Sequence, residues 1–196
     1  MLKRFFALLL CLTFLPAWAF DTAQLTAQLQ QPATVQGSFT QQRFLRTLSQ
    51  PMQTSGRFAL RNRHGLYWQI DQPFDLRLRV RPDGIAQWSG GQWRSTRQSG
   101  QAAQVKLFMA VLGGDMRELQ RQFDTRLTGH ARQWRLQLTP KTAVMRQVFD
   151  SITVEGGQLV QRIELNEKQG DRTVMQFHQL QAGQALSGPA AQALAP

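Results

Sequence analysis

The residue types that most often carry out chemistry are sparse in this sequence. The three histidines, His64, His130 and His178, lie far apart and follow no metal-ligand spacing, such as two histidines four residues apart on a helix. Neither a Gly-x-Ser-x-Gly elbow nor a glycine-rich phosphate or dinucleotide motif is present. We therefore predict no catalytic residue, no metal site and no cofactor, and interpret the histidines as surface or structural residues.

The acidic residues offer only a weak case for hydrolysis. The closest pairs are Glu164 with Glu167 and Asp71 with Asp75, at positions typical of strand ends and turns. Paired carboxylates can cleave glycosidic bonds, but the separation that this chemistry needs is set by the fold and not by the sequence. The sequence favours a protein that binds over one that catalyses.

The first nineteen residues have the pattern of a cleaved signal peptide. Lys3 and Arg4 precede an apolar run, and Ala17 and Ala19 suit a signal peptidase. Cleavage would remove Cys11, the only cysteine, and leave 21 basic and 12 acidic residues. We therefore expect an exported, periplasmic chain without disulfides. A basic exported protein meets anionic lipids or acidic partners more often than nucleic acid.

The remaining chain predicts one mainly β domain with a helical insertion. Strand-like segments punctuated by glycine and proline recur at a spacing typical of an antiparallel meander. The stretch "DLRLRVR" alternates apolar side chains with Arg77, Arg79 and Arg81, which predicts a strand with an apolar and a cationic face. We expect a domain at residues 20–181 that begins with a short helix, a helical insertion at 101–123 with an apolar stripe, and a tail at 182–196 with at most one helical turn.

A sheet of this many strands should curl into a full or partial barrel. Its apolar positions outnumber those that a few short helices can cover, which predicts a lined cavity, although an ordinary filled core is the simpler alternative for any one residue. Aromatic residues interleaved with arginine could also bind single-stranded nucleic acid. Export and the opposite faces of the rings and cations argue against that alternative.

The chain resembles the LolA-type periplasmic lipoprotein carriers, and especially their divergent relatives. The resemblance extends from the N-terminal helix to about Gln181, and it rests on "VQGSFTQQR", on "GRFAL" followed by "GLYWQIDQPFDLRLRVRPDG", and on "ITVEGGQLVQRIELNEKQGDRTVMQFHQL". It implies an incomplete antiparallel β-barrel of about eleven strands, closed by a helical lid over a hydrophobic cavity for acyl chains. The residues expected to line that cavity are Phe39, Phe58, Leu60, Trp68, Ile70, Leu78, Val80, Trp88, Phe108, Met109 and Leu112.

One position departs from the family pattern. In the carriers that the chain resembles, an arginine of an Arg-Pro pair holds the lid to the barrel. An alignment without gaps between Gly56 and Trp68 places Asn62 at that position. Arg61 and Arg63 flank it, so either is a candidate for the latch.

The leading hypothesis is a monomeric periplasmic carrier that binds the acyl chains of a lipoprotein or another lipid. Its partners would be an inner-membrane donor and an outer-membrane acceptor. The rival hypothesis is an interaction protein that carries nothing and docks an acidic partner or an anionic membrane through Arg77, Arg79 and Arg81.

Overall fold

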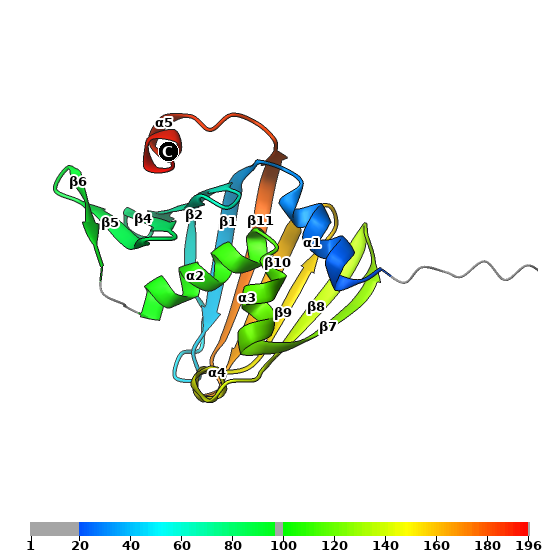
Figure 1. Ribbon diagram of the computed structural model, residues 1–196. Helices are drawn as coiled ribbons and strands as arrows, with labels where there is room; N and C mark the ends of the chain where they lie inside the picture. The colour runs from blue at the N-terminus through cyan, green and yellow to red at the C-terminus, as the bar shows by residue number, and fades with distance from the viewer. Residues whose placement is uncertain (1–19, 97–99, 196) are drawn as a thin grey trace, which may run out of the picture.

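The computed structural model describes residues 20–96 and 100–195 (Figure 1). The expected signal peptide, residues 1–19, lies outside the described residues. The first half of the sheet contains β1 (Thr34–Phe44), β2 (Met52–Arg61), β3 (Gly65–Gln72), β4 (Leu76–Arg81), β5 (Gly84–Ser89) and β6 (Gln92–Ser95). The second half contains β7 (Phe123–His130), β8 (Gln133–Pro140), β9 (Phe149–Gly156), β10 (Val160–Glu167) and β11 (Arg172–Ala182). The helices are α1 (Thr22–Gln30), α2 (Gly100–Leu112), α3 (Met116–Gln122), α4 (Ala143–Val148) and α5 (Gly188–Ala193).

All eleven strands form one antiparallel sheet that is not closed, which confirms the predicted incomplete barrel. The strand order is β6-β5-β4-β3-β2-β1-β11-β10-β9-β8-β7, with β6 and β7 at the two edges. Each half is a meander of neighbouring strands, and the pairing of β1 with β11 joins the halves. The two halves therefore share one concave face, although their sequences are separated by α2 and α3 (Figure 1).

Local sequence signals explain the helices that cover this concave face. The Asp21 side chain accepts a hydrogen bond from Gln24 N, while the Gln24 side chain accepts one from Asp21 N, so both orphan donors at the start of α1 are satisfied. In the region of the predicted helical insertion lie α2 and α3, which are separated by Gly113 and Gly114, and Phe123 already begins β7. Gly114 adopts a φ of 62°, in the left-handed region that ends helices.

The apolar face of every central strand points toward these helices and forms the main core. Phe39 of β1 stacks on Trp68 of β3 with ring centroids 4.0 Å apart, and Trp68 stacks on Phe108 of α2 at 5.4 Å. In β4, Leu78 and Val80 are buried on this face, as the alternation predicts. The sheet and α2 are thus held together by apolar contacts between large side chains.

The prediction that Trp88 lines the cavity is wrong, because Trp88 does not lie on the concave face. Val80 pairs with Ile85 and Arg79 with Ala86, and directly paired residues share a face, so Trp88 lies on the convex face with Ala86. There it is 38% exposed and meets Trp93 edge-on.

The C-terminal segment is also more ordered than the sequence predicted. It leads to α5, which places Ala193 and Leu194 on a small apolar cluster with Ala59 and Tyr67 on the convex face. Arg61 Nη1 donates to Leu194 O at 3.1 Å, and Arg81 Nη2 donates to Ala193 O at 2.9 Å. The convex face of β2 to β4 is therefore partly covered by the end of the same chain.

Substitution of Leu194 tests this docking. Leu194→Asp places a charge in a buried site and should lower the free energy of unfolding by about 2–4 kcal/mol. Gln192→Asp, at an exposed position of α5, is the matched control and should change little. Urea unfolding followed by tryptophan fluorescence measures both, and equal midpoints for the two variants would contradict the docked segment.

Candidate functional site

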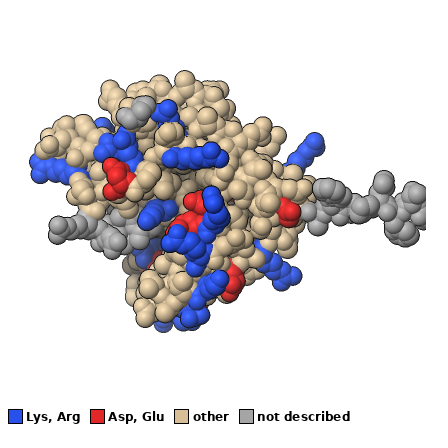
Figure 2. All heavy atoms as spheres, viewed as in Figure 1, with Lys and Arg blue, Asp and Glu red and all other residues tan. Residues whose placement is uncertain are grey.

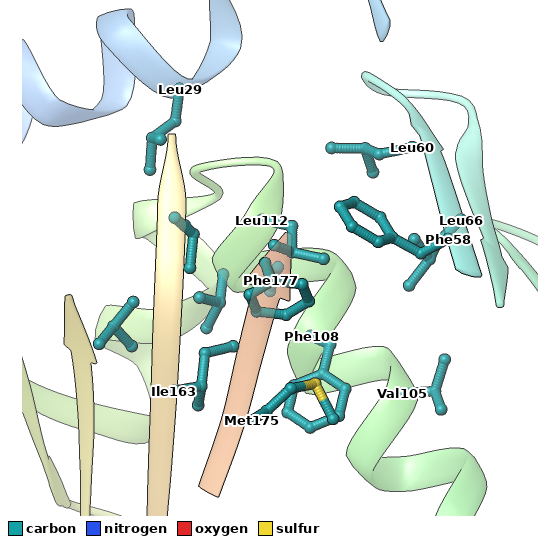
Figure 3. Close-up of a cluster of buried hydrophobic side chains, with 14 of the residues drawn as sticks. Leu29, Phe58, Leu60, Leu66, Val105, Phe108, Leu112, Ile163, Met175 and Phe177 are labelled. Atoms are coloured by element: carbon teal, nitrogen blue, oxygen red, sulfur yellow. The ribbon is translucent and has the colours of Figure 1, made fainter. Parts of the chain in front are cut away.

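Most residues predicted to line a cavity are instead packed into the core. Figure 3 shows Phe58, Leu60, Phe108 and Leu112 in one cluster of buried side chains with Ile163 of β10 and with Met175 and Phe177 of β11. With Phe108 stacked on Trp68, the chain's own side chains occupy the space between α2 and the sheet. The predicted cavity residues that are buried here are Phe39, Phe58, Leu60, Trp68, Ile70, Leu78, Val80, Phe108 and Leu112.

The open space lies beside α2 and not beneath it. A groove of about 1360 Å³ follows α2 and α3 from the β2–β3 and β4–β5 turns to α4 and the adjacent ends of β1 and β10. This volume exceeds the roughly 300–1,000 Å³ of typical small-molecule sites. Of the predicted cavity residues, only Leu60 and Met109 line it. Its other apolar lining residues are Ile85, Leu107, Ala110, Leu119, Phe123, Val144, Met145, Val148 and Phe149.

The sequence analysis missed most of these lining residues for identifiable reasons. Leu107 lies off the regular stripe of α2, which buries Val105 and Phe108 against the core. Val144, Met145 and Val148 belong to a six-residue helix that is too short to show a periodic pattern. The spacing of Val144 and Val148, four residues apart, is the one signal that could have indicated a shared helix face.

The polar part of the groove is mostly cationic. The lining cations are Arg43, Arg61, Arg63, Lys106, Arg117 and Arg121, against Asp115, Glu118 and Glu167. Figure 2 shows the same face, where basic side chains gather over α2 and α3 with acidic side chains between them.

The acidic lining residues have partners within the protein. Glu118 Oε2 lies 3.0 Å from Arg121 Nη1, Glu167 Oε1 lies 3.3 Å from Arg43 Nη2, and Asp115 caps α3 by accepting from Glu118 N at 3.1 Å. The groove therefore combines an apolar surface with polar lining residues of net positive charge.

Asn62 connects the β2–β3 turn to the end of α1. Its Nδ2 lies 2.6 Å from Pro32 O and 3.2 Å from Leu29 O. Gln30 Nε2, in turn, donates to Gly114 O at 3.2 Å, which ties α1 to the break between α2 and α3. The residue at the expected latch position thus supports the base of the helical cover through α1.

Neither flanking arginine is seen to act as the predicted latch. The hydrogen bond of Arg61 goes to Leu194 O in the C-terminal segment. Arg63 adopts a φ of 63° in the β2–β3 turn and lines the groove. Asn62, which lies between the two arginines, bonds to α1 and so itself connects the barrel to its cover.

The three arginines of β4 lie on the convex face, as their alternation predicts, but each has a neighbour there. Arg77 Nη2 lies 3.0 Å from Asp75 Oδ2, and the Arg79 guanidinium lies 5.0 Å from the centre of the Trp93 ring. Burial, together with repulsion from Arg81, lowers the pKa of Arg79. Arg81 donates to carbonyl oxygens of the C-terminal segment. The cationic face is therefore largely engaged within the chain.

The described residues give no indication of a metal centre or a membrane-spanning helix. Within residues 20–96 and 100–195, no three histidine, cysteine, aspartate or glutamate side chains are grouped to hold an ion. Across the same ranges, no helix is both long and apolar enough to cross a bilayer. His178 Nε2 instead lies 3.0 Å from Thr40 Oγ1 on paired strands, as a structural histidine would.

An open half-barrel whose concave face is covered by helices beside an apolar groove defines a class of binding proteins. The chain belongs to the LolA family: residues 30–190 match the family model described as outer membrane lipoprotein carrier protein LolA. The description of the family model is that of a carrier protein. No curated protein matches the chain in a sequence search.

Solved structures share the fold at low sequence identity. MucB in complex with MucA(peri) is 18% identical, with a TM-score of 0.51 over 90% of this chain and 60% of that chain. The Pseudomonas aeruginosa MucA/MucB complex is 18% identical, with a TM-score of 0.51 over 88% and 58%. The LolA superfamily protein NE2245 from Nitrosomonas europaea is 10% identical, with a TM-score of 0.49 over 87% and 96%. This chain thus spans about three fifths of the MucB chains it matches.

Substitution of Asn62 tests the support beneath the cover. Asn62→Ala removes a donor to partly buried carbonyl groups and should lower the free energy of unfolding by about 1–3 kcal/mol. Asn62→Asp should cost more, because a carboxylate cannot donate and would face carbonyl oxygens. Arg63→Ala, in the same turn, is the control. Chemical denaturation ranks the variants, and an Asn62→Asp protein as stable as the unmodified one would contradict this role.

Proposed function

We propose that the protein is a periplasmic carrier that binds acyl chains of a lipoprotein or another lipid and delivers them to the outer membrane. The observation that carries the proposal is the arrangement of α2. This helix packs on the sheet through apolar side chains such as Phe108, and a large groove runs along it. Such a helix can be displaced without breaking a ladder of backbone hydrogen bonds.

Burial of an acyl chain needs no polar anchor. Each Å² of apolar surface removed from water contributes about 25 cal/mol, so a long chain gains substantial affinity from contact alone. The groove supplies apolar side chains from both sides, including Leu60 and Ile85 from the sheet and Leu107 and Met109 from α2. A cargo that enters beside α2 meets a surface of the required chemistry.

Deeper burial would require α2 to move. If the helix swings about Gly113 and Gly114, the Trp68 ring loses its contact with Phe108, and Trp68 and the Phe39 ring stacked on it become available to the cargo. An acyl chain that binds the open form better than the closed form would shift the population toward opening. The residues assigned from the sequence, Phe58, Ile70, Leu78, Val80 and Leu112 among them, would then line the cavity of the loaded state.

Delivery requires one partner that loads the cargo and another that receives it. We propose an inner-membrane donor and an outer-membrane acceptor, with the protein acting as a monomer between them. The acceptor must offer a deeper apolar site or favour the open form, because burial alone gives the cargo no reason to leave.

The rival is a protein that carries nothing and docks an acidic partner through Arg77, Arg79 and Arg81. In its favour, MucB was solved with MucA, so a chain of this fold can hold a protein partner. Against it, Arg77 is paired with Asp75 and Arg81 holds the C-terminal segment. Charge reversal of Arg77 and Arg79 separates the two: lost partner association with intact lipid binding favours the rival.

Displacement of a fluorescent fatty acid by palmitate tests the carrier. The protein should bind the probe, and Leu107→Asp with Met109→Asp should weaken binding at least about tenfold, because charges would enter the apolar groove. Both side chains are only partly buried, so the variant should fold.

The control carries the same charge change elsewhere. Ala131→Asp with Gln158→Asp alters the exposed β7–β8 and β9–β10 turns, which do not line the groove, and this variant should bind the probe as the unmodified protein does. Absence of bound lipid, both in this titration and in native mass spectrometry of protein isolated from its own periplasm, would refute the carrier.

A further inference from the structure

The large exposed hydrophobic residues within 20–96 and 100–195 are concentrated at one end of the sheet. Of the six found in these ranges, five lie in or beside connections between strands, whereas Trp88 lies on the convex face. We name these five the apolar rim. Its members are Leu48, Met52, Phe74, Val144 and Val148.

Strand pairing shows that the rim belongs to a single end. Met52 pairs with Arg43 at the close of β1, and the neighbouring Phe44 pairs with Arg172 at the start of β11. Glu167, at the end of β10, pairs with Phe149, which directly follows α4. The connections β1–β2, β8–β9 and β10–β11 are therefore neighbours, at the lower end of the sheet in Figure 1.

The β3–β4 connection belongs to the same end. Gln72 pairs with Ser55 near the start of β2, so Phe74 follows a strand that ends beside Met52. The opposite end holds α1, the β2–β3 turn and the β9–β10 turn, and no described residue there is a large exposed hydrophobic. Scattered exposed apolar residues are ordinary, but their restriction to one end marks an interaction surface.

Helix α4 shows the pattern most clearly. Val144 and Val148 lie one turn apart and are 63% and 43% exposed, whereas Met145 packs against the core. Thr142 caps the helix by accepting from Met145 N at 3.3 Å, which stabilises the first turn of α4. The helix thus presents an apolar pair to solvent, although it could have presented polar residues there at no cost to the core.

Cations accompany the rim. Arg46, Lys141, Arg146 and Lys168 are exposed in the same connections. Lys168 Nζ pairs with Asp150 Oδ1 at 2.8 Å, but Lys141 and Arg146, on either side of Val144, have no ion-pair partner among the described residues. Aliphatic side chains interspersed with cations fit the boundary between head groups and acyl chains of an anionic membrane.

We infer that the apolar rim docks the protein on an anionic phospholipid surface. Val144 and Val148 also line the groove, together with Arg43 and Glu167 of the same end. A bilayer at the rim would therefore lie directly against the mouth of the groove. The docking surface does not depend on acyl-chain binding and can be tested apart from it.

Co-sedimentation of the protein with lipid vesicles is the test. Vesicles of phosphatidylcholine mixed with phosphatidylglycerol should bind the protein more tightly than vesicles of phosphatidylcholine alone. Leu48→Asp with Met52→Asp, and separately Val144→Asp with Val148→Asp, should each weaken binding about tenfold. Lys141→Gln with Arg146→Gln should reduce the preference for phosphatidylglycerol.

The control again is Ala131→Asp with Gln158→Asp, which adds two negative charges at the opposite end and should bind vesicles normally. If this control weakened vesicle binding equally, the loss would be due to net charge, and docking through the apolar rim would be contradicted. A wild-type protein that stays in solution with both kinds of vesicle would also overturn it, and would leave the rim to a protein partner.

A second readout keeps this inference separate from the carrier proposal. Leu48 and Met52 do not line the groove, so their double variant should bind the fluorescent fatty acid as the unmodified protein does. Loss of vesicle binding with retained fatty-acid binding supports the rim. If the unmodified protein does not bind the fatty acid, the result counts against the carrier proposal and leaves the membrane-docking inference untouched.

Discussion

The structure depends on one constraint: an open antiparallel sheet has an apolar concave face that must be kept from water. The pairing of β1 with β11 joins two meanders into a single curved surface that is wider than either half. Three helices cover it, and α2 does so at its centre, where Phe108 stacks on Trp68 and Trp68 on Phe39. The position of α2 fixes the core, the groove beside the helix and the base at Gly113 and Gly114 from which it could move.

The convex face is covered in part by the C-terminal segment of the same chain. There the arginines of β4 face outward, and one of them, Arg81, together with Arg61 of β2, holds the end of the chain. Arg61 and Arg81 donate to backbone carbonyls of the C-terminal segment, while Leu194 fills a small apolar site beside Tyr67. Burial raises the pKa of Tyr67, whose hydroxyl donates to Gln69 Oε1 at 2.8 Å. A cationic strand face that looked like a docking surface in the sequence is thus partly an internal structural element.

The sequence predicted what depends on local pattern. The alternation in "DLRLRVR" correctly placed Leu78 and Val80 inward, and the stripe through Val105 and Phe108 correctly indicated a helix against the sheet. The sequence pattern could not show on which face of the sheet Trp88 lies, because that depends on the register of β5 with β4.

Other features depend on packing between distant segments. Strand β6 is four residues long, and β7 carries alternate exposed positions with few large apolar residues, so neither gives a strong period. Apart from Trp88, most of the residues assigned to a cavity are buried between the sheet and the helices, but whether such positions surround a space or fill it depends on the position of α2. The role of Asn62 rests on carbonyls at the end of α1 and just after it, some thirty positions earlier, which no local pattern encodes.

The closed arrangement also bears on how a carrier of this design could both hold and release its cargo. When α2 covers the sheet, the apolar surfaces of Phe39 and Trp68 are already out of water. A cargo that displaces the helix exchanges one apolar contact for another, so much of the gain from its burial is offset by the contact that is lost. The net preference for the loaded state is then small compared with the area involved. Because that preference is small, a modest advantage at the donor or the acceptor suffices to set the direction of transfer.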